Sequence, residues 1–399
     1  MPRILRIHNR LIIGGPTLNV LYLTKYLAPE FETLLIVGEK EAHEKDAFFL
    51  AEQMGITTLS IPDMGRSLHP YRDYKAYNRV KKIIKDFKPH IVHTHAAKPG
   101  AVGRLAAHAW GNPVVVHTYH GHVFHSYFNR LKTGLIINIE RHLAKRTDAL
   151  IAISDQQKKE LAEEFRIAAD DKFKVIPLGF ELNKFQSQQH EKRMKFRNEF
   201  NLHDDDIAIG IIGRLVPVKN HVLFLQGIDY VIRNSKKKIR AFIIGDGETR
   251  NSTEQKAKEL GISFTSAGNV NENASLVFTS WRSDIDVINA GLDIIALTSL
   301  NEGTPVSLIE AQAANKPIVS TRVGGIGDVV VENKTGLLCD VNDTASFQQN
   351  LLALAENDEL RNYLGRNGAG HVLQKFDVAR LVDDMATLYR ELLAKKNSE

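Results

Sequence analysis

The sequence predicts an α/β protein with two doubly wound parallel sheets, and three observations support this class. The chain has 399 residues, whereas a single hydrophobic core stops growing at roughly 250 to 300 residues. Short runs rich in Ile, Val and Leu alternate with longer amphipathic segments along the whole chain, as repeated strand–helix units require. Glycines and polar residues follow several of these runs, where open parallel sheets bind ligands.

Each apolar run is assigned to a strand in chain order. In the first half we expect strands at residues 4–7, 33–37, 57–61, 90–95, 114–119, 149–154 and 174–177. In the second half we expect them at residues 207–212, 241–244, 292–297 and 317–320, where the sheet should end. The pattern becomes helical after Leu338, and a long last helix is expected over residues 378–394.

A polar, charged stretch separates the two halves and has few apolar residues to tie it to either core. We therefore expect a first domain over residues 1–183, a linker over residues 184–204 and a second domain over residues 205–375. Residues 376–399 should form a C-terminal helix that packs on a domain surface, and that surface could belong to the first domain.

Composition favours an ordinary globular protein. Apolar residues make up 43% of the chain and charged residues 25%, which are average values for soluble domains. The single cysteine, Cys339, excludes an internal disulfide, and residues 1–10 do not resemble a signal peptide. No apolar run approaches the roughly 18 residues of a membrane-spanning helix. We expect a cytoplasmic protein whose membrane contacts are at most peripheral.

The two halves carry opposite net charges. Residues 1–200 contain 31 Lys and Arg against 21 Asp and Glu, whereas residues 201–399 contain 21 against 26. A basic surface attracts nucleic acid, anionic lipid or phosphorylated ligands, although solvated helix faces explain such charge equally well. Charge alone therefore does not identify the partner of the first half.

Gly14 and Gly15 precede a segment, residues 17–27, that is expected to be helical. Glycines before a helix let backbone N–H groups bind phosphate, aided by the positive end of the helix dipole. A plain tight turn is the alternative. The full fingerprint Gly-x-Gly-x-x-Gly is absent, which argues against NAD.

Histidines gather at the ends of two expected strands, at positions 93, 95, 117, 120, 122 and 125. Alternate strand residues share a face, so His93 pairs with His95 and His120 with His122. A metal site would need further ligands, and no Asp, Glu or Cys stands nearby at a familiar spacing. We therefore expect some buried, hydrogen-bonded histidines, with His120 as the one that contacts a substrate hydroxyl.

Two loops of the second half carry groups suited to a diphosphate. Gly213 and Arg214 directly follow the first strand, and Lys219 opens the next helix. Arg binds phosphate in a bidentate manner and Lys as a point charge, whereas solvated loop charges are the alternative. A similar turn with Gly245 follows the next strand.

The segment from Glu302 to Glu310 is the most informative in the sequence. Glu302 precedes a helix that we expect to run through Ala314, and Glu310 lies about two turns on, on nearly the same face. The backbone N–H groups at the helix start can bind an anion, and proline suits the first turn. The residues between the two glutamates that we assign to the site are Gly303, Thr304, Pro305, Val306 and Ser307.

Together these residues closely resemble glycosyltransferase family 4, the retaining group 1 glycosyltransferases, which have the GT-B fold of two Rossmann-like domains. The resemblance covers nearly the whole chain and includes the motifs IVHTHAAKPG, VIPLGFELNKF, GRLVPVKN, FIIGDGE and SLNEGTPVSLIEAQAANKPIVSTRVGGIGDVV. It is most specific in the last motif, where the family has two glutamates separated by seven residues. It departs from the family at residues 266–274, which form a longer stretch than usual.

The resemblance implies a role for each candidate residue. Glu302 would contact donor sugar hydroxyls, Glu310 the ribose, and His120 the transferred sugar. Arg214 and Lys219 would hold the diphosphate, which the loop at Gly15 would also approach. The backbone at Trp281 and Arg282 would meet the base.

The resemblance also implies the reaction. A retaining transfer from a nucleotide diphosphate sugar, with UDP as the expected nucleotide, would need no metal or other cofactor. The first domain usually binds the acceptor, and residues 129–146 read as a basic amphipathic helix. We therefore expect a saccharide or lipid-linked acceptor of bacterial surface-polysaccharide synthesis, possible contact with the inner face of the cell membrane, and no nucleic-acid partner. The alternative is a nucleotide-sugar 2-epimerase of the same fold.

Overall fold

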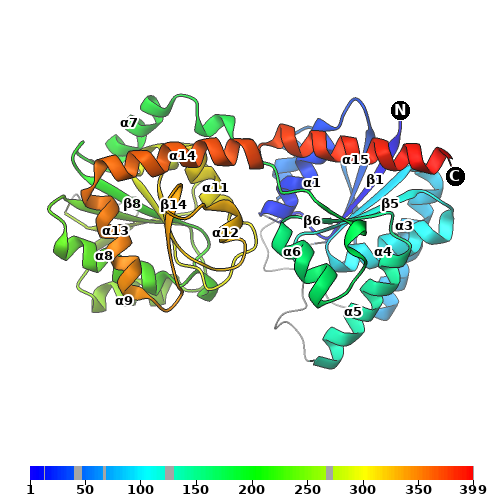
Figure 1. Cartoon of the computed structure of the whole chain (residues 1–399), viewed down its shortest axis with the longest axis horizontal. Helices are drawn as coiled ribbons and strands as arrows, with labels where there is room; N and C mark the ends of the chain where they lie inside the picture. Colours follow the sequence, from blue (N-terminus) through cyan, green and yellow to red (C-terminus); the bar gives the residue numbers. More distant parts are fainter. Residues whose placement is uncertain (13, 40–46, 66–68, 122–129, 267–272, 399) are drawn as a thin grey trace. The chain divides into compact units, whose positions relative to one another are not determined.

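The computed structural model describes residues 1–12, 14–39, 47–65, 69–121, 130–266 and 273–398. It contains two seven-stranded parallel sheets, each in its own compact unit. One unit comprises Met1–Phe180 with Phe376–Glu399, and the other comprises Glu181–Lys375 (Figure 1). The predicted α/β class with two doubly wound sheets is therefore confirmed.

The first unit has the strand order β3-β2-β1-β4-β5-β6-β7. All seven expected strands are present, with ends that differ by at most two residues. Its strands are β1 Arg3–His8, β2 Glu32–Gly38, β3 Thr58–Ile61, β4 Ile91–His95, β5 Val114–Tyr119, β6 Ala149–Ala152 and β7 Phe173–Val175. Its helices are α1 Gly15–Tyr26, α2 Phe48–Gln53, α3 Pro70–Phe87, α4 Ala97–Trp110, α5 Arg130–Lys145, α6 Asp155–Lys159 and α15 Val378–Ser398.

The last helix, α15, completes the core of this first unit, although residues 181–375 of the chain, which form the second unit, come before it. Leu381, Met385 and Tyr389 are buried in one cluster with Ile4 of β1 and Val114 of β5. α15 also contacts α1 (Figure 1). Because the helix buries an apolar face here, the first unit depends on the end of the chain for its stability.

We therefore expect Leu381→Ala to destabilise the first unit by about 2 to 5 kcal/mol, the usual cost of emptying a fully buried leucine site. Leu381 is 1% exposed. The matched control is Thr387→Ala on the exposed face of the same helix, which should change stability by less than about 0.5 kcal/mol. Urea unfolding measures both, and equal stability of the two variants would contradict this role for α15.

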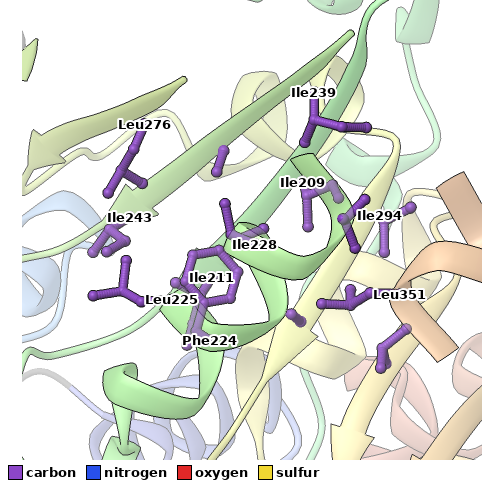
Figure 2. Packing of buried hydrophobic residues seen from close by; sticks show 14 of the residues in the cluster. Ile209, Ile211, Phe224, Leu225, Ile228, Ile239, Ile243, Leu276, Ile294 and Leu351 are labelled. Atoms are coloured by element: carbon purple, nitrogen blue, oxygen red, sulfur yellow. The ribbon is translucent and has the colours of Figure 1, made fainter. Parts of the chain in front are cut away.

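The second unit has the strand order β10-β11-β9-β8-β12-β13-β14. Its strands are β8 Ile207–Ile212, β9 Ile239–Ile244, β10 Phe264–Ser266, β11 Leu276–Ser280, β12 Ile294–Leu297, β13 Ile318–Thr321 and β14 Gly336–Cys339. Its helices are α7 Gln189–Glu199, α8 His221–Asn234, α9 Arg250–Glu259, α10 Ile285–Gly291, α11 Val306–Ala313, α12 Ile326–Val329, α13 Thr344–Glu356 and α14 Asp358–Phe376. Side chains from β8, β9, β11 and β12 pack against α8 and α13 in its core (Figure 2).

Two expectations about this unit were wrong. The sheet does not end at residues 317–320, because β14 pairs with β13 from Gly336 to Cys339. Residues 184–204 are not a loose connection: they contain α7, and the buried rings of Phe196 and Phe200 each lie 5.1 Å from that of Phe242. The few aromatic residues of this polar stretch are enough to fix it to the second unit.

Candidate functional site

The main candidate site lies at the carboxyl ends of β8 and β12 in the second unit. These strands are neighbours although they are far apart in sequence, so the strand order reverses between them, and such switch points bind ligands in open α/β sheets. The loops that follow the two strands are joined by hydrogen bonds. Leu300 N donates to Val218 O at 2.8 Å, and Thr298 Oγ1 donates to Lys219 O at 2.9 Å.

The two loops place Lys219 and Glu302 in direct contact. Lys219 Nζ forms an ion pair with Glu302 Oε1, which also accepts a hydrogen bond of 2.5 Å from Ser299 Oγ. The side chains are 20% and 12% exposed, so both are half-buried yet reachable by a ligand. A Cβ atom on Gly213 would lie 3.6 Å from Lys219 Cε. The structure thus brings together three of the predicted residues.

Arg214 and Gly245 complete the loops around this pair. Arg214 follows β8, and its side chain is exposed. Among the described residues it forms no ion pair. Gly245 follows β9 with a φ of +135°, and a Cβ atom there would lie 2.0 Å from Gly213 O. Only glycine permits this close approach of the two backbones.

The sequence prediction missed the turn that supports Glu302. Gly324 and Gly325 follow β13, and Gly325 N donates to Glu302 O at 3.1 Å. A Cβ atom on Gly324 would lie 2.0 Å from Glu302 O, and one on Gly325 would lie 2.0 Å from Gly303 O. The motif VGGIGD was visible in the sequence, but its packing partner was not.

Helix α11 begins at Val306, directly after Pro305, and ends at Ala313. The first N–H groups of a helix have no partner within it and carry the positive end of the dipole. Such a helix start can bind an anion, and here it follows Glu302 closely in sequence. That Gly303, Thr304, Pro305, Val306 and Ser307 contact a ligand stays a prediction.

Glu310 occupies the fifth position of α11 and is half-buried. Burial raises the pKa of its carboxyl group to about 7, and Asp286 acts in the same direction, while the positive charge of Lys184 partly opposes them. A carboxylate held near its titration point in this way is a frequent feature of ligand sites.

Trp281 and Arg282 follow β11, on the far side of β9 from β8. The Trp281 side chain is 46% exposed. The Arg282 guanidinium is held by Asp284 at 2.7 and 2.8 Å and by Glu199 of α7. The side chain of Arg282 thus has a structural role. The contact predicted with the nucleotide base would therefore involve the backbone of this loop.

Gly14 and Gly15 lie where helix α1 begins in the first unit. Gly15 is the first helical residue, two positions earlier than expected, and is buried. Thr17 Oγ1 donates to Ile12 O at 2.6 Å and so closes the turn before the helix.

A second polar cluster follows the switch point of the first sheet, where β1 and β4 are neighbours. His8 of β1, His95 of β4 and His120 after β5 face one another, with ring centroids 5.2 to 6.3 Å apart. Burial lowers the pKa of His8 to about 4 and that of His120 to about 3. The prediction singled out His120 but missed His8. It also missed the buried side chain of Arg6.

A metal centre would need three or four ligand side chains close together. Among the described residues, no group of three or more His, Cys, Asp or Glu side chains is arranged to hold a metal ion. His122 and His125, and most of the long stretch at residues 266–274, lie outside the described residues. Within the same limits, no helix is long and apolar enough to span a membrane.

Comparisons with known proteins point to one family. Residues 192–371 match the family described as Glycosyl transferases group 1, and residues 13–184 match Glycosyltransferase Family 4. The chain is 30% identical over 338 residues, 84% of each protein, to the UDP-Gal:alpha-D-GlcNAc-diphosphoundecaprenol alpha-1,3-galactosyltransferase of Escherichia coli. It is 24% identical to the capsular polysaccharide biosynthesis glycosyltransferase CapM of Staphylococcus aureus, over 84% of this chain and 85% of CapM.

Solved structures agree on the fold. A glycosyltransferase of Rickettsia africae superimposes with a TM-score of 0.79 at 20% identity, covering 98% of each chain. HepE of Anabaena, solved in complex with UDP, superimposes with a TM-score of 0.77 at 21% identity, covering 98% of this chain and all of HepE.

Proposed function

This chain belongs to glycosyltransferase family 4, the group 1 glycosyltransferases of GT-B fold, and from this premise we propose its reaction. It transfers a sugar from a UDP-linked donor to a saccharide or lipid-linked saccharide, with retention of the anomeric configuration. The galactosyltransferase from Escherichia coli is named for a UDP-Gal donor, and HepE was solved in complex with UDP; both support the nucleotide. The acceptor of that galactosyltransferase, GlcNAc-diphosphoundecaprenol, also supports a lipid-linked acceptor.

The ion pair between Lys219 and Glu302 carries this proposal. It lies at the switch point of the second sheet, and its acid directly precedes the anion-binding end of α11 in sequence. Glu302 accepts hydrogen bonds from hydroxyl groups of the donor sugar. Lys219, Arg214 and the amides of α11 bind the diphosphate, and Glu310 binds the ribose.

Charge development explains how these groups promote transfer. As the bond between the anomeric carbon and the diphosphate breaks, negative charge grows on the leaving oxygen, where fixed cations and N–H groups stabilise it most. The acceptor oxygen forms its new bond on the same face, and its proton passes to the leaving phosphate oxygen. Arg214 and Lys219 supply the positive charge in this scheme, so we propose that no metal is needed.

Ligand-induced stabilisation tests which nucleotide the donor carries. A ligand present at about 100 times its dissociation constant stabilises the folded state by about 2.7 kcal/mol. We expect UDP and one UDP-sugar to raise the melting temperature more than ADP, GDP or dTDP and their sugars do. A larger shift with another nucleotide would contradict the UDP assignment, and no shift with any nucleotide would contradict the donor site.

The pH dependence of donor binding tests Glu310. A carboxyl group whose pKa is raised to about 7 in the folded protein is mainly protonated below that pH. Ribose hydroxyl groups donate best to the ionised form, so the affinity for a UDP-sugar, which has no terminal phosphate that titrates in this range, should rise between about pH 6 and pH 8 as the carboxylate forms. Calorimetric titration measures this rise, and Glu310→Gln should remove it. A pH profile that is the same in both proteins would contradict the ribose contact.

Helix α5 supports peripheral contact with a membrane. Leu135 and Ile139, one turn apart, are 62% and 44% exposed on a helix that ends at Lys145, directly before Arg146. Exposed apolar residues on a helix that also carries cations suit binding to an anionic bilayer surface. We expect the protein to sediment with vesicles containing anionic lipid at low salt, and Leu135→Glu with Ile139→Glu to abolish this. No binding of the unaltered protein would contradict the proposal.

A further inference from the structure

The polar cluster of the first unit contains a continuous row of hydrogen bonds that ends at His120. Arg6 Nη1 lies 3.3 Å from His95 Nε2, and His95 Nδ1 lies 2.9 Å from His120 Nε2. The rings of His95 and His120 are stacked, with an interplanar angle of 18°. At the end of the row, His120 Nδ1 is buried and has no hydrogen-bond partner among the described residues.

This row has a direction because its first member cannot accept a hydrogen bond. A guanidinium group carries only donors, and a neutral imidazole has one donor and one acceptor nitrogen. Arg6 therefore donates to His95 Nε2, which leaves the ring proton of His95 on Nδ1. His95 in turn donates to His120 Nε2, so the ring proton of His120 must be on Nδ1.

These proton positions require neutral rings, and the surroundings provide them. Burial is the largest cause that lowers the pKa of both His95 and His120. For His95 a charge on His93 or His120, the guanidinium of Arg6 and a charge on His8 would each act in the same direction, and for His120 a charge on His8 would. Arg6 is fully buried, so it is a permanent positive charge beside the row.

We propose that Arg6 and His95 are positioning residues that hold His120 as the Nδ1–H tautomer. The protonated Nδ1 of His120 then donates a hydrogen bond to an oxygen atom of a ligand. In this tautomer Nδ1 does not act as a base. The identity of that ligand rests on the proposed function, under which the oxygen belongs to the transferred sugar. The tautomer itself does not depend on that function.

A second branch of the same cluster provides an internal control. Arg6 Nη1 also lies 3.0 Å from His93 Nδ1, and the Tyr389 hydroxyl group lies 2.5 Å from the same nitrogen. His93 Nε2 then donates to Thr118 Oγ1 at 2.8 Å. This branch ends within the protein, so Tyr389→Phe should disturb His93 and leave the row to His120 intact.

Long-range ¹H–¹⁵N correlation spectra of the full chain labelled with [¹⁵N]histidine measure the tautomer directly. The signals of His120 are identified by their loss in His120→Gln. We expect Nδ1 of His120 to be the protonated nitrogen in the unaltered protein and in Tyr389→Phe. His95→Leu and Arg6→Met remove the directing donors, so both should give a mixture of the two tautomers at His120. His95→Gln can accept from Arg6 and donate to His120, and should restore the single tautomer.

The spectra need no substrate, so they stay informative if no transfer is observed. A proton on Nε2 of His120 in the unaltered protein would overturn the proposal, as would a His120 tautomer that is unchanged in His95→Leu. With an active donor and acceptor pair, His95→Leu should lower kcat about tenfold, the worth of one well-aligned hydrogen bond, while His95→Gln and Tyr389→Phe stay within about twofold. Unchanged kcat in His95→Leu would refute the contact with the ligand.

Discussion

Lys219→Ala is expected to lower kcat/KM by about 100- to 1000-fold, the usual cost of removing a preorganised group that stabilises charge in the transition state. Two losses contribute to this effect. The diphosphate loses a fixed cation, and Glu302 loses the partner that holds its carboxylate in place. Initial rates with saturating acceptor and varied donor concentration measure the change.

The control for Lys219→Ala is Lys256→Ala. Lys256 also forms an ion pair, with Glu259 at 3.1 Å, but on the exposed surface of α9. Its removal should leave kcat/KM within about twofold, because exposed ion pairs contribute little. Lys219→Arg keeps the charge and should retain part of the activity. Full activity of Lys219→Ala would refute the assignment of this residue to the diphosphate.

Glu302→Gln is expected to lower kcat/KM by about 100-fold while it leaves the affinity for free UDP within about twofold. The substitution keeps the size of the side chain but removes its charge, and hydrogen bonds to a charged group contribute about 1.5 to 3 kcal/mol each. UDP has no transferred sugar, and the amide oxygen of Gln can still accept a hydrogen bond from Lys219, so UDP binding should change little. Calorimetric titration with UDP and with the UDP-sugar separates the two effects.

Glu332→Gln serves as the matched control for Glu302→Gln. Glu332 pairs with Arg322 in the same unit, and both side chains are more than one third exposed. This variant should bind UDP and the UDP-sugar like the unaltered protein. If Glu302→Gln instead weakened UDP and UDP-sugar to the same extent, Glu302 would contact the nucleotide and not the sugar.

The class of fold could be predicted because buried parallel strands appear in a sequence as short apolar runs. β8, with the sequence IAIGII, is such a run and is fully buried. β10 has only three residues and β14 only four, at the two edges of their sheet, so neither run stood out. The prediction also overlooked β11, although its LVFTS sequence is apolar and buried.

The candidate site could be predicted only where its residues are close in sequence. Gly213, Lys219, Glu302 and Glu310 stand in recognisable motifs after strands. The support of Glu302 by Gly324 and Gly325 depends on how β13 pairs with β12, and the contact between Arg6 and His95 depends on how β1 pairs with β4. Such lateral pairings are not local, so single motifs do not reveal them.

The most direct test of the proposed function is the product formed from a UDP-sugar with and without a lipid-linked saccharide acceptor. We predict a new glycosidic bond only when the acceptor is present, with the same anomeric configuration as the donor by NMR, and an unchanged rate in EDTA. Conversion of the UDP-sugar to its 2-epimer without acceptor would contradict the account. A product of inverted configuration, or loss of activity in EDTA that divalent metal restores, would contradict the mechanism derived from Lys219, Arg214 and Glu302.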